Sequence, residues 1–157
     1  KESSAASDVY KRQITFDTGK QPQTGIANFM LKDNIPYLWL ELNGIPAMMH
    51  WDTGMNAKPR LSGRFYAEHA SSLPELGSVR KGSEITAAGA AEYSYHTLGG
   101  ICAKIGSREV ILPEMRVVFD TEDMHTAEVT GYDGQMNNIV DVRRIRIDFE
   151  NMCVTME

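Results

Sequence analysis

Residues 36–54 read PYLWLELNGIPAMMHWDTG, and this stretch decides the fold. Apolar and polar residues alternate towards the end of residues 36–42, which is typical of a half-buried strand. Asn43-Gly44 follows, and this dipeptide favours a tight hairpin turn because both residues tolerate positive φ. Residues 45–51 then return as a second strand. The stretch therefore predicts a hairpin that carries Asp52-Thr53-Gly54 at its end.

The rest of the chain also reads as short strands separated by turns. Further strands are predicted at residues 13–16, 26–31, 84–88, 92–98, 101–105, 109–112, 115–119, 144–149 and 152–156. Gly106-Ser107 and Pro113-Glu114 are predicted turns, and residues 71–82 and 120–126 are predicted loops. One helix is predicted at residues 61–70, from apolar side chains three to four positions apart, and a short one within residues 131–142. Many strands with few helices predict an all-β fold, closed or sandwiched.

Length and composition indicate an ordinary globular domain. The chain has 157 residues, with 42% hydrophobic residues and a net charge of −5, and it contains no basic stripe of the kind that binds nucleic acid. No apolar run is long enough to span a bilayer. Residues 1–25 are predicted to be a partly flexible lead-in whose polar start resembles the remainder of an export signal. This suggests a periplasmic or secreted protein, with the cytoplasm as the alternative.

Cys102 and Cys153 lie in apolar, strand-like contexts, so we interpret both as small buried residues, and a disulfide requires their strands to be neighbours. The four histidines lack the spacing of metal ligands, and no metal or cofactor is predicted.

Asp52 is the candidate catalytic residue. Gly54 allows a tight turn in which a backbone amide approaches the carboxylate, and Thr53 offers a hydroxyl that can lock the loop. If two such loops met across a twofold axis, the two carboxylates would share a proton, one acting as base on a water and the other as acid. The second copy of the tripeptide, Asp17-Thr18-Gly19, lacks the preceding hairpin, so we interpret it as a local turn.

The hairpin, its Asp-Thr-Gly end and the order of the later segments resemble the retropepsin-like aspartic proteases (clan AA), in their bacterial single-lobe type. Residues 84–96, centred on Gly89, resemble the flap that closes over substrate, and residues 132–140 resemble the segment that runs into a short helix. The resemblance covers roughly residues 26–156 and implies a single-lobe closed β-barrel domain over residues 26–157. It implies an aspartic endopeptidase that acts as a homodimer on peptides or proteins. The site residues implied are Asp52, Thr53 and Gly54 for catalysis, and Met55, Gly89 and Tyr93 for substrate binding.

Three departures from the family pattern support an alternative function. Met55 stands where the family has Ala or Ser, and Gln135 and Asn137 stand where it has an apolar residue and Gly. These departures suggest a catalytically inactive retropepsin-like module that binds a partner. A third hypothesis is an unrelated β-barrel, in which Asp52 would lie on an exposed turn away from any cleft.

Overall fold

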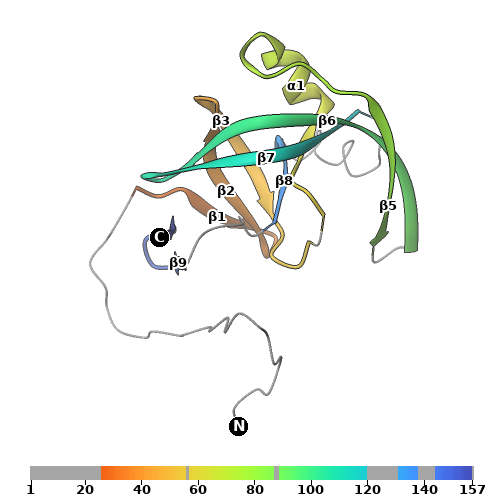
Figure 1. The fold of residues 1–157 in the computed structure, drawn as a ribbon. Coiled ribbons are helices and arrows are strands. Elements are labelled where there is room, and N and C mark those ends of the chain that lie inside the picture. Colours follow the sequence, from red (N-terminus) through yellow and green to blue (C-terminus); the bar gives the residue numbers. More distant parts are fainter. Residues whose placement is uncertain (1–25, 56, 87–88, 120–130, 138–143, 157) are drawn as a thin grey trace.

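The computed structural model describes residues 26–55, 57–86, 89–119, 131–137 and 144–156 (Figure 1). Within them, strands predominate, as the sequence predicts, and one short α-helix is present. The strands are β1 Phe29–Lys32, β2 Ile35–Leu42, β3 Ile45–Trp51, β4 Arg60–Ser62, β5 Val79–Thr86, β6 Gly89–Ile105, β7 Arg108–Val118, β8 Gly134–Met136, β9 Ile145–Asp148 and β10 Cys153–Met156. Helix α1 spans Gly63–His69 and continues into a 3-10 turn, Ala70–Ser72.

Eight strands of the described residues form one mixed sheet in the order β1-β2-β3-β8-β4-β7-β6-β5. An additional pairing between β2 and β6, through Glu41↔Lys104 and Leu42↔Ala103, closes the strands from β2 to β6 into a ring. The fold is therefore all-β and barrel-like, with a closed single lobe. The β5–β6 hairpin extends away from this ring (Figure 1).

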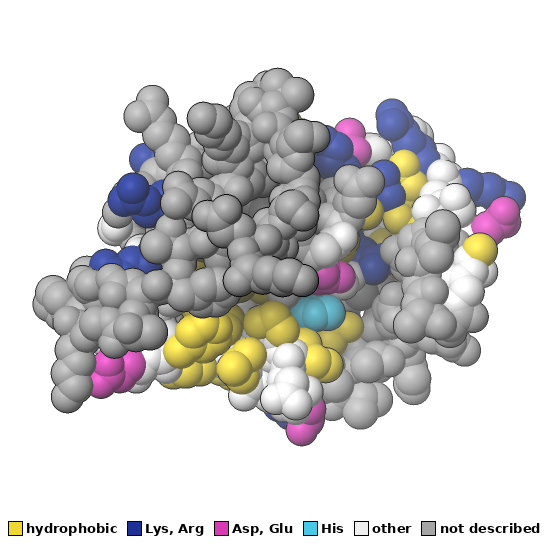
Figure 2. All heavy atoms as spheres, turned by 90° about the horizontal axis from the view of Figure 1, so that it is seen from below, with side chains coloured by type: hydrophobic (Ala, Val, Ile, Leu, Met, Phe, Trp, Pro, Cys, Tyr) yellow, Lys and Arg dark blue, Asp and Glu magenta, His cyan; other side chains and the backbone are white. Residues whose placement is uncertain are grey.

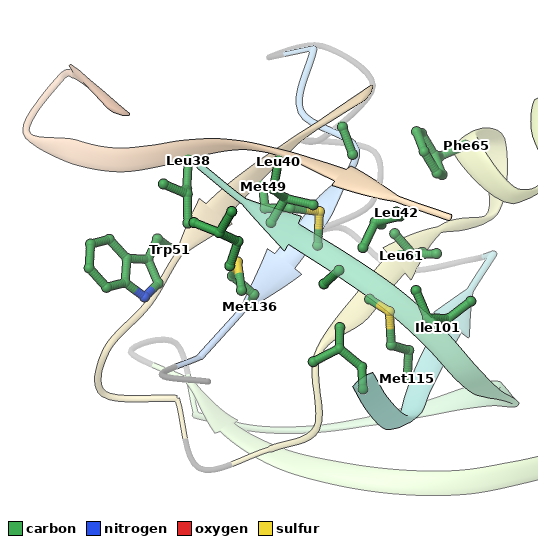
Figure 3. Close-up of a cluster of buried hydrophobic side chains, with 14 of the residues drawn as sticks. Leu38, Leu40, Leu42, Met49, Trp51, Leu61, Phe65, Ile101, Met115 and Met136 are labelled. Atoms are coloured by element: carbon green, nitrogen blue, oxygen red, sulfur yellow. The ribbon is translucent and has the colours of Figure 1, made fainter. Parts of the chain in front are cut away.

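The hairpin predicted at residues 36–51 is confirmed. β2 and β3 pair antiparallel up to Leu42↔Ile45, and Asn43 and Gly44 both have positive φ, 49° and 80°. Positive φ at both turn positions matches the twist of the two strands. The inward side chains of both strands fill the core (Figure 3), together with others from β4, β6, β7 and β8. The core side chains of the hairpin are Leu38, Leu40, Leu42, Ala47, Met49 and Trp51.

The short helix predicted within residues 131–142 does not lie in residues 131–137, the part that the structure describes. Gly134–Met136 forms strand β8 instead, which runs parallel to β3 and antiparallel to β4. β8 thus lies between two strands that are distant in sequence, and its hydrogen bonds come from these neighbours rather than from a helical turn. Residues 138–143 lie outside the described residues, as do the predicted strand at 13–16 and the predicted loop at 120–126.

Three other boundaries differ from the prediction. β7 continues through Pro113, because the pairs Gly99↔Glu114 and Ile101↔Leu112 hold the strands on either side of the proline. β6 is accordingly one long strand rather than two. β5 begins at Val79, within the predicted loop, because it pairs with β6 as far as Val79↔His96.

The closing hairpin predicted at residues 144–156 is confirmed as the β9–β10 pair, a separate two-stranded sheet. Asn28, which is buried, ties it to the start of β1. Its Oδ1 accepts from Val154 N at 2.7 Å and its Nδ2 donates to Val154 O at 3.1 Å. Both contacts imitate the backbone bonds of a neighbouring strand, so the side chain satisfies the edge of β10.

Cys102 and Cys153 are both free thiols. Cys153 is buried and Cys102 is partly buried. Burial raises the pKa of the Cys153 thiol, because its charged form would lose hydration.

No helix in the described part of the chain is long and apolar enough to cross a membrane. Hydrophobic side chains do gather on one outer face, beside a histidine (Figure 2).

Helix α1 begins two residues later than predicted, since residues 60–62 pair as β4 and Ser62 caps the helix. The Ser62 hydroxyl accepts from Phe65 N at 3.1 Å. We expect Ser62→Ala to lower the free energy of unfolding by about 0.5–2 kcal/mol, because a buried helical amide would lose its partner. Urea unfolding followed by circular dichroism measures this. Ser71→Ala, at an exposed position of the next turn, is the matched control, and equal midpoints for the two variants would contradict the capping role.

Candidate active site

Asp52 directly follows strand β3, on a tight turn. Its backbone N donates to Met136 O at 2.9 Å, and its backbone O accepts from Met55 N at 3.2 Å. Gly54 N donates to Asp52 Oδ1 at 2.9 Å, which is the approach of amide to carboxylate that the sequence suggests. Asp52 is partly exposed and Thr53 and Gly54 are exposed. The carboxylate is therefore oriented by its own turn while remaining open to the outside.

The second oxygen of Asp52 faces strand β8. Gln135 Nε2 lies 3.5 Å from Asp52 Oδ2, a long contact at the limit of a hydrogen bond. Gln135 Oε1 in turn accepts from Arg60 Nε at 2.8 Å and Arg60 Nη2 at 2.5 Å. Arg60 is opposite Gln135 in the β4–β8 pairing and is only 5% exposed. A buried cation is thus connected to the carboxylate through one neutral amide.

The same arginine also contacts the β5–β6 hairpin. The Arg60 guanidinium lies 5.8 Å from the centre of the Tyr93 ring, within the range of a cation–π contact. The Tyr93 hydroxyl accepts from Arg116 Nη1 at 2.6 Å, and the Arg116 guanidinium lies 4.4 Å from the centre of the Tyr95 ring. The β5–β6 hairpin is therefore packed, through Tyr93 and Tyr95, onto arginines of β4 and β7.

Asp133 connects the strands around the site, and its role is structural. Its carboxylate accepts from Met48 N through Oδ2 and from Arg64 Nη2 through Oδ1, both at 2.9 Å. Its backbone N donates to Met48 O at 2.7 Å, and its backbone O accepts from Ser62 N at 2.8 Å. One residue thus fixes the entrance of β8 between β3 and α1.

We expect Asp133→Ala to lower the free energy of unfolding by about 1–3 kcal/mol, because Met48 N and Arg64 would both lose an acceptor. Glu68→Ala is the matched control, since Glu68 pairs with the same arginine at 3.7 Å on the exposed side of α1. Its removal should cost no more than about 0.5 kcal/mol. Chemical denaturation compares the two variants, and equal losses would show that Asp133 is only another surface partner of Arg64.

The predicted site residues are brought together only in part. Asp52, Thr53, Gly54 and Met55 share one turn, and Met55 is partly buried. Tyr93 is buried and is connected to this turn through Arg60 and Gln135. Gly89 is exposed at the start of β6, with φ of 120°. A surface hollow on the β5–β6 hairpin is lined by Tyr93 with Val79, Lys81, Glu92, Ser94, Tyr95, His96 and Phe119, and Asp52 does not line it.

Other candidates lie as follows. Asn137, at the position where the family has Gly, donates through Nδ2 to Ala57 O at 2.9 Å and so holds the chain that follows the Asp52 turn. His50 lies on the face of β3 opposite Trp51, in ring contact with Tyr37 and Tyr132. The described residues contain no group of acidic, histidine and cysteine side chains suited to a metal ion. Asp17 lies outside the described residues.

Two features of the site are not predicted from the sequence: the presence of Arg60 and the role of the Gln135 amide. Gln135 was noticed as a departure from an apolar pattern, but no local signal indicates what its amide contacts. Arg60 directly precedes the helix predicted at residues 61–70, whereas in the structure it belongs to a buried three-residue strand.

No family model matches the sequence, and no curated protein matches it. Solved structures similar in fold include the retroviral protease-like domain of Ddi1 from Leishmania major, with 11% identity, a TM-score of 0.49, and coverage of 78% of this chain and 88% of that one. A retropepsin-like aspartic protease from Rickettsia conorii has 14% identity and a TM-score of 0.48, covering 82% and 87%. EIAV protease, complexed with the inhibitor HBY-793, has 18% identity and a TM-score of 0.36, covering 64% and 92%.

The ring of strands in the described residues agrees with the closed single lobe that the sequence resemblance implies. Identities of 11–18% concern the fold alone. Any activity has to be derived from the chain's own residues.

Proposed function

We propose that this chain is an aspartic-type endopeptidase lobe that hydrolyses peptide bonds as a homodimer, with Asp52 from each copy. One observation carries the proposal: Asp52 is partly exposed on an ordered turn, and among the described residues its side chain accepts from two neutral donors, Gly54 and Gln135. A carboxylate held in this way can act as a base, but the hydrogen bonds that the structure describes for it include none to a second carboxyl group. An identical copy is the simplest source of the second carboxylate.

The chemistry needs two carboxylates because two protons move. Like charges a few ångströms apart do not both ionise, so a pair of Asp52 side chains would share one proton. The ionised member takes a proton from a water molecule, which attacks the peptide carbonyl, and the protonated member donates to the carbonyl oxygen. No covalent intermediate and no metal is required.

The β5–β6 hairpin supplies the cover of the proposed cleft. Gly89 lies at its exposed end, where φ of 120° requires glycine. Tyr93, midway along it, packs on Arg60, so closure of the hairpin over a peptide would take place near the Asp52 turn. Met55 follows Asp52 on the same turn and would contact the substrate. These three residues are the proposed substrate contacts.

The proposal is tested by hydrolysis of a mixed peptide library at acidic pH, using the wild-type chain and Asp52→Ala. Turnover that requires Asp52, from a species that sediments as a dimer, is the expected result. Equal turnover by both proteins would end the catalytic assignment. A strict monomer at high concentration, without turnover, would instead support the inactive binding module.

A further inference from the structure

The amide of Gln135 has a defined orientation between two charged side chains. A guanidinium only donates hydrogen bonds, so the atom that receives Arg60 Nε and Nη2 has to be the carbonyl oxygen, Oε1. The NH₂ group of the amide must then point the other way, to Asp52 Oδ2. An ionised carboxylate only accepts, so the donor meets an acceptor. The chemistry of the two neighbours leaves one orientation for the amide.

From this geometry we propose that Gln135 and Arg60 are positioning residues for Asp52. Gly54 N donates to Oδ1 at 2.9 Å and Gln135 Nε2 approaches Oδ2 at 3.5 Å, so each oxygen of the carboxylate has a donor directed at it. Arg60 acts through Gln135 by fixing its amide. The consequence for catalysis rests on the proposed function, whereas the contact itself does not.

Arg60 is suited to fixing the Gln135 amide because its own position is rigidly held. It lies on β4, which pairs with β8 on one side and β7 on the other, and its side chain is buried. The Tyr93 ring covers its guanidinium. Groups carried on paired strands and packed on several sides hold a reacting atom more accurately than groups on loops.

An intervening amide also keeps the positive charge one step away from Asp52. A direct arginine contact would occupy the carboxylate with two donors, whereas the amide uses one position on Oδ2. A carboxylate offers about four acceptor positions, so room remains on both oxygens for a water molecule and for the second carboxylate of the dimer.

Two substitutions of Gln135 distinguish the effect of its hydrogen-bond donor from the effect of its size. Gln135→Met keeps the length of the side chain and removes the donor. Gln135→Glu keeps an acceptor for Arg60 but places an acceptor oxygen opposite Asp52 Oδ2. We expect both variants to lower kcat about 10- to 100-fold with KM little changed, the usual loss when a residue that orients a reacting group is removed. Glu41→Gln, which alters only the exposed pair with Lys104, is the isosteric control and should keep the wild-type kcat.

A second readout does not depend on activity. In the full-length chain, the side-chain ¹H–¹⁵N signals of Gln135 are assigned by their absence from Gln135→Met, and we expect them to shift in Asp52→Asn. Unchanged signals would overturn the inference, as would wild-type kcat in Gln135→Met. Shifted signals in a wild-type chain that lacks turnover would keep the positioning contact and reject the proposed function. An active wild-type chain with an unaffected Gln135→Met would reject the inference and keep the function.

Discussion

Asp52→Asn should reduce peptide hydrolysis by about 10²–10⁴-fold, the range for loss of a general acid–base group. Asparagine has the shape of aspartate but cannot take a proton from water at the pH of the assay. The position is partly exposed on a turn, so the fold should be retained. Initial rates on a cleaved peptide, measured at saturating and at limiting substrate, determine whether the loss lies in kcat.

Asp33→Asn is the matched control for this experiment. Asp33 is exposed in the turn before β2 and has φ of 53°, a conformation that asparagine also tolerates. It should keep the wild-type rate. Comparable rates for Asp52→Asn and the wild type would remove Asp52 from the reaction.

Gly134→Ala should have the largest effect on stability, because β8 passes between β3 and β4 without space for a side chain. A Cβ at this position would lie 2.2 Å from Arg60 O, 2.8 Å from Met49 Cε and 3.1 Å from Leu61 Cα. Two of these atoms belong to the backbone of β4, which is paired on both sides and cannot yield. Overpacking a core typically costs about 1–3 kcal/mol, and we expect Gly134→Ala to lower the free energy of unfolding by more than this.

The measurement is urea unfolding of Gly134→Ala beside Gly99→Ala. Neither glycine has positive φ, and a Cβ at Gly99 would meet only Pro113 O, at 3.3 Å. The control should therefore lose much less. Similar midpoints for the two variants would mean that β8 does not pass as closely between its neighbours as the structure has it.

The β2–β3 hairpin could be predicted from sequence because its determinants are local. Asn43-Gly44 sets the turn, and the alternation on either side sets which side chains face the core. The same holds for the β9–β10 hairpin. Strand β8 could not be predicted, because a strand of three residues derives its stability from β3 and β4, more than 70 residues away in sequence. The turn predicted at Pro113-Glu114 is wrong for a similar reason, because pairs with β6 on both sides of the proline keep strand β7 continuous.

For the site, the sequence identifies the candidate carboxylate but not the residues that surround it. Asp52 is recognisable because its tripeptide follows a hairpin. Gln135 attracts notice only as a polar residue in an apolar pattern. Arg60 gives no signal, because a buried arginine is acceptable only where distant partners such as Gln135 and Tyr93 receive it.

The central claim, that each lobe contributes one carboxylate and needs an identical copy, is tested most directly by subunit mixing. Wild-type and Asp52→Asn chains are unfolded together, refolded in varied proportions at constant total concentration, and assayed for hydrolysis. If both carboxylates are required, activity falls as the square of the wild-type fraction, because mixed dimers are inactive. A strictly linear decrease would contradict the account, since each wild-type chain would then be working alone.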